Sequence, residues 1–101
     1  MSNDQKQTIC IAWFRRDQWL LLKQKATDPE IIEDTYEEWE AEAERAVQQL
    51  TALGMLVKKI DVDIYELEEW CKANGLPMDG EARSGFAAEK GYDLYNEDFD
   101  W

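Results

Sequence analysis

The most constraining feature of the sequence is a long amphipathic segment between two apolar, strand-like segments. The segment Tyr36–Leu53 begins with a capping box, formed by Thr35 and Glu38, and ends before Gly54. At 100° per residue, its apolar side chains share one face, within an arc of about 120°. These side chains are Tyr36, Trp39, Ala43, Ala46, Val47, Leu50 and Leu53. The pattern predicts a helix that packs on a core through this face and exposes glutamates on the others.

The segments on either side of this helix are typical of β-strands. Ile9–Phe14 is a nearly unbroken run of apolar, β-forming residues, which predicts a strand buried on both faces. Met55–Val62 places Leu56, Ile60 and Val62 on one alternating face of a second strand. Since a long helical crossover joins the two strands, we expect them to be parallel, with a right-handed connection.

Three further helices are predicted around this unit, over residues 17–26, 63–75 and 79–91, with Gly91 ending the last one. Asp63 and Glu66 form a second capping box at the start of the middle helix. The predicted order is β-α-α-β-α-α, an α/β fold with a small parallel sheet of two strands and about four helices. An α+β arrangement is the alternative. Two strands leave two open edges, so we expect helices or a second copy of the chain, in a homodimer, to cover them.

Length and composition indicate one acidic domain. The chain has 101 residues, so we expect a single domain over 1–101, with a frayed N-terminus (1–7) and an acidic, aromatic tail (92–101). Lys and Arg number 11 against 23 Asp and Glu, for a net charge of −12. This balance argues against direct binding to nucleic acid or to an anionic membrane. Without an apolar leader or span, we expect a cytoplasmic protein.

The chain has no histidine and two cysteines. We expect Cys10 to be a core residue of the first strand and Cys71 to pack late in its helix, both as reduced thiols. No histidine is present to activate a thiol, so we predict no catalytic residue, no metal site and no cofactor. Arg83 is expected to pair with a carboxylate rather than to clamp an anion. Enzymatic activity is left open, and the residues weigh against it.

One set of charged residues is predicted at the carboxyl ends of the strands. Arg15 and Arg16 follow the first strand, and Asp61 and Asp63 lie at the end of the second. Carboxyl ends of parallel strands meet at one edge, where open α/β sheets bind ligands. Arginines match phosphate or carboxylate oxygens, and a D-x-D pair can hold Mg²⁺. These four residues form a candidate ligand site for a small-molecule or metal-assisted enzyme; ordinary salt bridges, with Asp63 as an N-cap, are the alternative.

Acidic residues are concentrated just before and along the long helix. Between residues 28 and 44 the chain has no base and the following acids: Asp28, Glu30, Glu33, Asp34, Glu37, Glu38, Glu40, Glu42 and Glu44. Such a surface can attract a basic or mixed-charge protein, or imitate DNA phosphates as an inhibitor of a DNA-binding protein. We take Glu37, Glu40 and Glu44 as candidate partner-binding residues. The alternative is a solvated helix face that keeps a small protein soluble.

The tail, YDLYNEDFDW, alternates aromatic and acidic residues. Such a segment can stay solvated until a basic, apolar groove captures it. This makes Tyr95, Phe99 and Trp101 candidate partner-binding residues. Alternatively, these aromatic side chains fold back over the core or over a dimer mate.

Four stretches of the sequence, FRRDQW, TYEEWEAEAERAVQQL, VDIYELEEWC and EARSGFAAEK, resemble a family of small, uncharacterised bacterial proteins of about this length. The resemblance covers residues 9–90. It implies a bacterial origin and a common fold but no chemistry, and the acidic tail lies outside it. Together with the charge pattern, it favours an acidic bacterial protein-interaction module. A strand-end enzyme and a structural homodimer subunit are the alternatives.

Overall fold

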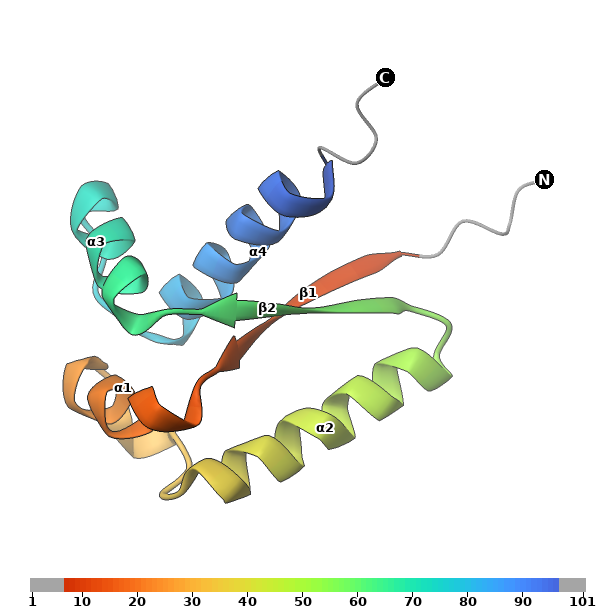
Figure 1. Cartoon of the computed structure of the whole chain (residues 1–101), viewed down its shortest axis with the longest axis horizontal. Helices are drawn as coiled ribbons and strands as arrows, with labels where there is room; N and C mark the ends of the chain where they lie inside the picture. Colours follow the sequence, from red (N-terminus) through yellow and green to blue (C-terminus); the bar gives the residue numbers. More distant parts are fainter. Residues whose placement is uncertain (1–6, 97–101) are drawn as a thin grey trace.

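The structure of the protein is a computed structural model, and it describes residues 7–96. Its elements follow the order predicted from the sequence, and the mixed α/β fold is confirmed (Figure 1). They are β1 (Thr8–Phe14), α1 (Trp19–Lys25), α2 (Tyr36–Ala52), β2 (Leu56–Val62), α3 (Ile64–Asn74) and α4 (Gly80–Asn96), with 3₁₀ turns η1 (Arg16–Gln18) and η2 (Pro29–Ile31). The predictions for residues 1–6, Phe99 and Trp101 lie outside the described residues.

β1 and β2 form a parallel pair, in register from Thr8 opposite Leu56 to Phe14 opposite Val62. The main-chain nitrogen of Leu56 donates to the carbonyl of Gln7 at 2.9 Å, and this bond shows which residues of β1 are hydrogen-bonded to β2. Because a parallel strand uses alternate residues to bond one neighbour, the odd-numbered residues of β1 bond to β2. The main-chain groups of its even-numbered residues therefore point to the outer edge of the sheet.

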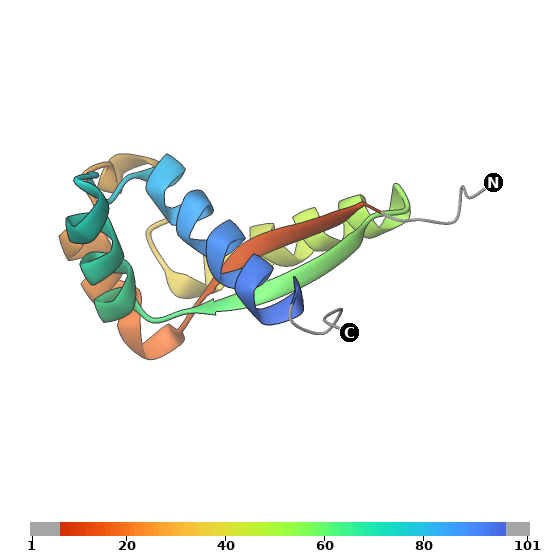
Figure 2. The same cartoon turned by 90° about the horizontal axis from the view of Figure 1, so that it is seen from above.

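The helices α2 and α4 cover opposite faces of this sheet (Figures 1 and 2). On the α2 face, the ring centroids of Trp13 and Trp39 lie 5.0 Å apart. On the other face, α4 approaches so closely that a Cβ at Gly91 would overlap the Sγ of Cys10 and lie 3.1 Å from Ile60. The prediction that Gly91 ends the last helix is therefore wrong. Gly91 lets α4 pass over the sheet, and the helix continues to Asn96.

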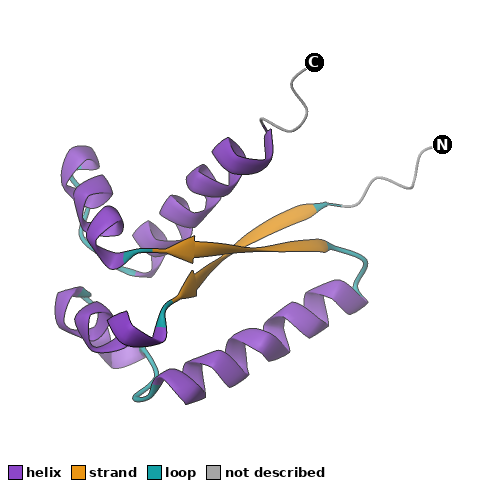
Figure 3. Ribbon diagram, viewed as in Figure 1, coloured by secondary structure: helices purple, strands orange, loops and turns teal. Residues whose placement is uncertain are grey.

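The core lies toward the carboxyl ends of the strands, where all four helices gather (Figure 3). Of β1, only Phe14 is buried, and residues 9–13 are half-buried, so the prediction of a strand buried on both faces is wrong. On β2, Ile60 and Val62 are buried as predicted, but Leu56 is 43% exposed. Within residues 7–96 the sheet has no third strand and α2 has no buried residue, so the amino-terminal half of the sheet is incompletely covered.

The predicted helix caps are present at α2 and half present at α3. Thr35 accepts from the main chain of Glu38 at 3.1 Å, and the Glu38 carboxylate accepts from the main chain of Thr35 at 3.3 Å. At α3, Asp63 accepts from the nitrogen of Tyr65 at 3.0 Å. The expected reciprocal bond from Glu66 is replaced by an ion pair with Lys90, whose nitrogen lies 3.4 Å away. Every helix within residues 7–96 is too short or too polar to cross a bilayer.

Candidate functional site

The structure brings three of the four predicted strand-end residues together. Arg15 donates to both carboxylate oxygens of Asp61, at 3.0 and 2.6 Å, and its guanidinium lies 4.0 Å from Asp63. Asp63 also accepts from the amide of Gln18 at 3.0 Å. The hydrogen bond from Arg15 lowers the pKa of Asp61, and the bond from Gln18 lowers that of Asp63. Arg15, Asp61 and Asp63 therefore each interact with another side chain of the protein.

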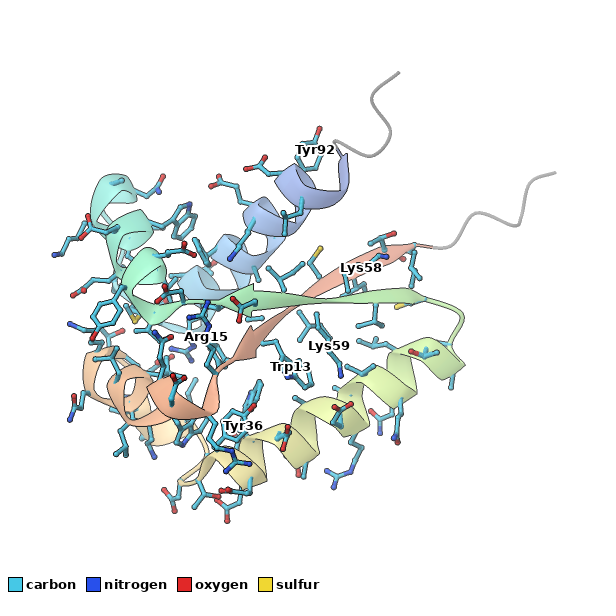
Figure 4. The ribbon with its side chains drawn as sticks, in the orientation of Figure 1. Trp13, Arg15, Tyr36, Lys58, Lys59 and Tyr92 are labelled. Carbon is cyan, nitrogen blue, oxygen red and sulfur yellow. The ribbon has the colours of Figure 1, made fainter. Side chains whose placement is uncertain are left out.

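The fourth residue, Arg16, turns away from this group. It forms an ion pair with Glu37, and its guanidinium lies over the ring of Tyr36, 4.7 Å from the centroid. Figure 4 shows Arg15 beside the end of β2 and Tyr36 at the start of α2. Among the described residues, no group of three or more cysteine, aspartate or glutamate side chains is placed to hold a metal ion. The geometry of the four residues is that of structural ion pairs.

Two bases that precede the acidic segment (residues 28–44) in the chain, Arg16 and Lys23, neutralise part of it. Lys23 lies 3.5 Å from Asp34, and Arg16 pairs with Glu37. Farther along α2, Lys59 stacks on Trp13, 4.2 Å from its ring centroid, and reaches Glu44 at 3.0 Å (Figure 4).

Nine of the arginines and lysines within residues 7–96 each lie within 4.0 Å of a carboxylate oxygen. The chain has 12 more acids than bases, so its surplus surface charge consists of carboxylates. Glu37, Glu40 and Glu44 follow one another along one side of α2, because they are three and four residues apart. The Glu37 and Glu44 side chains stay 65% and 45% exposed despite their ion pairs. Of the aromatic tail candidates, Tyr95 lies on the last turn of α4.

A pocket of about 320 Å³ lies against β1 and was not predicted from the sequence. Residues 10–12 and Phe14 of β1 line one side, and Trp39 of α2 lines another. The pocket is completed by Trp19 and Leu22 of α1, by residues 31–33 at the end of η2 and just beyond it, and by the first turns of α4. Its volume falls within the range of ligand pockets, about 300–1,000 Å³. The structure thus places a mostly apolar hollow where the sheet ends.

One polar group in this pocket wall lacks a partner. Trp19 is 5% exposed, and its indole Nε1 is the buried side-chain nitrogen or oxygen that has no hydrogen-bond partner among the described residues. Leaving a buried donor unpaired costs about 1–3 kcal/mol.

The other charged groups of the pocket differ in how far they are neutralised. Arg83, predicted to pair with a carboxylate, donates to Asp28 at 2.7 Å, and this bond lowers the pKa of Asp28. Glu33 also lines the pocket; its main-chain carbonyl accepts a hydrogen bond from Lys23 at 3.1 Å, and its carboxylate forms no ion pair within residues 7–96. The lining of the pocket therefore includes one arginine that Asp28 neutralises and one glutamate.

The pocket could not be predicted from the sequence, because segments that are distant along the chain form it. Trp39, predicted to pack on the core, does so beside Trp19, and the centroids of the two rings lie 5.7 Å apart. Arg83 and Asp28 stand 55 positions apart, and no local pattern links them. The one available signal was the two-stranded sheet, which implies an open edge.

Comparison of the chain with family models, with curated proteins and with solved structures found no match. The resemblance over residues 9–90 therefore stays a prediction from the sequence.

Proposed function

We propose that this chain is an acidic protein-interaction module that binds a basic or mixed-charge segment of another protein. One observation carries the proposal: nine of the described arginines and lysines are engaged with the chain's own carboxylates, while the acids outnumber the bases of the chain by 23 to 11. A partner that approaches therefore meets mainly unneutralised carboxylate. Such a surface speeds association with a basic partner and selects against acidic ones. The bacterial and cytoplasmic setting remains a prediction of the sequence.

The strand-end enzyme is a weaker candidate in this light. Arg15 donates to both carboxylate oxygens of Asp61, so the two side chains are engaged with each other rather than with a ligand. None of the four residues proposed for that site lines the pocket against β1. The DNA-mimic inhibitor is a sharper form of the interaction proposal. It predicts that the protein competes with duplex DNA for a DNA-binding protein, whereas a general basic partner requires no such competition.

The test compares two triple variants that remove the same charge from different surfaces. E37Q/E40Q/E44Q neutralises the candidate side of α2, and E66Q/E69Q/E81Q neutralises acids on α3 and α4. The sets are matched, because in each one two acids form exposed ion pairs with the chain's own bases. Binding to a ten-residue polylysine peptide is measured by titration calorimetry at low and at physiological salt.

We expect the α2 triple to weaken peptide binding about tenfold more than the control triple, and the wild-type affinity to fall steeply with salt. Equal losses in both triples would show that net charge, rather than the α2 surface, attracts the peptide. If the wild-type protein fails to bind polylysine at low salt, the proposed function is wrong.

A further inference from the structure

We propose that the outer edge of β1 receives an extended, basic segment of the partner as a third strand, with one of its side chains in the adjoining pocket. This inference rests on the proposed function and names the mode of binding. It starts from the sheet, which has two strands and no third within the described residues. The main-chain groups of Cys10 and Ala12 point to the outer edge, because the odd-numbered residues of β1 are the ones that bond to β2.

The pocket beside this edge gives an added strand a place for a side chain. Cys10 and Ala12 line it together with the apolar rings of Trp19 and Trp39. Strand addition takes its affinity from main-chain hydrogen bonds and its specificity from pockets that accept alternate side chains. An open edge with a pocket directly against it supplies both.

The charges around the pocket favour a lysine or arginine side chain. Its aliphatic stem would lie along the apolar wall while its charged end reaches Glu33, which also lines the pocket. Glu30 and Asp34 lie close to Glu33 on the same loop, and Asp34 is 93% exposed although Lys23 lies 3.5 Å away. Arg83 does not oppose a cation, because Asp28 neutralises it at 2.7 Å.

The same charges disfavour a second copy of the chain at this edge. Pairing β1 with another β1 brings two chains of net charge −12 together, each with this acidic loop beside the contact. The acidic loop would therefore attract a basic strand and repel a second copy of the chain.

The experiment uses the full chain and two synthetic peptides. One is an eight-residue peptide of alternating valine and lysine; the other has the same sequence with a methyl group on every main-chain nitrogen. The second keeps the charge but cannot donate main-chain hydrogen bonds. Amide and indole signals of the ¹⁵N-labelled protein are followed by NMR during titration.

We expect the unmethylated peptide to bind at least tenfold more tightly than the methylated one. On binding, the amides of Cys10 and Ala12 should become protected from exchange and the Trp19 indole signal should shift. Glu33→Gln should weaken this binding severalfold more than Glu30→Gln, a matched change on the same loop that does not line the pocket.

Other outcomes overturn the inference in distinguishable ways. If both peptides bind equally and shift only signals of α2, strand addition is wrong while the proposed function stands. If neither peptide binds, this inference fails, and the polylysine titration decides the proposed function separately. If Cys10 and Ala12 are protected without peptide and sedimentation gives a dimer, a second copy occupies the edge.

Discussion

At the scale of single residues, the fold depends on a few close approaches and buried pairs. Gly91 lets α4 lie directly on Cys10, where any larger residue would collide. Arg83 and Asp28 join the start of α4 to the loop before α2, and Asp28 also accepts from the main chain of Gly80 at 2.9 Å. These contacts link segments that are far apart in the sequence.

Gly91→Ala is expected to lower the free energy of unfolding by about 1–3 kcal/mol, because the added methyl overlaps Cys10. Gly85→Ala is the matched control on the same helix. Its Cβ would meet Trp70 at 3.4 Å, an ordinary contact, so the better helix propensity should leave stability unchanged or raise it by up to about 1 kcal/mol. Urea denaturation measures both. Adding Cys10→Ala should recover part of the Gly91→Ala loss, and full stability of Gly91→Ala alone would contradict the packing.

Asp28→Asn is expected to cost about 2 kcal/mol at neutral pH, since Arg83 then keeps a buried charge without its counter-charge. Arg83 lowers the folded-state pKa of Asp28, so the stabilisation is complete above the unfolded value of 3.8 and is lost as pH falls through the lower folded value. The difference between wild type and variant should therefore shrink below pH 3.8. Denaturation at a series of pH values tests this, and a difference that grows toward acid would refute it.

At the scale of elements, α2 depends on its ends and on one patch of aromatic contacts. None of its residues is fully buried, and its strongest contacts, through Tyr36 and Trp39, lie in its first turn. The capping box of Thr35 and Glu38 holds the same end. The amino-terminal end of α2 therefore anchors the helix to the core.

Thr35→Ala should destabilise the protein by about 1 kcal/mol, because the first turn of α2 loses its cap. Thr51→Ala, an exposed change near the other end of the helix, is the control and should stay within about 0.5 kcal/mol. Thermal unfolding followed by circular dichroism compares the two. Equal effects of both substitutions would mean that the cap contributes nothing beyond helix propensity.

The element order, the α2 cap and the parallel pairing could be predicted, because helical periodicity and a long crossover are local properties of the sequence. The length of α4 could not, since Gly91 has the same local signature whether it ends a helix or lets one pass over a sheet. Arg16 was placed with Arg15 by sequence adjacency, yet neighbouring residues beyond a strand point in different directions. The pocket depends on Trp19, Trp39 and Arg83 meeting in space, which only the tertiary structure defines.

At the scale of the whole molecule, unneutralised negative charge opposes compaction. The described bases already pair with carboxylates, so the remaining acids repel one another. Raising NaCl from about 20 mM to about 500 mM should increase the urea midpoint, because salt screens this repulsion more than it weakens the short ion pairs. A midpoint that falls with salt would show that the ion pairs outweigh the repulsion.

Within residues 7–96 the sheet ends at β1, and the proposed binding mode requires the outer edge of β1 to be unpaired. Amide hydrogen exchange in the free protein, resolved by NMR, measures this directly. Ile9, Ile11 and Trp13, whose amides face β2, should exchange slowly, whereas Cys10 and Ala12 should exchange at least tenfold faster. Equally slow exchange along the whole strand would mean that another chain or segment already occupies the edge, and would contradict the open edge on which the binding mode is built.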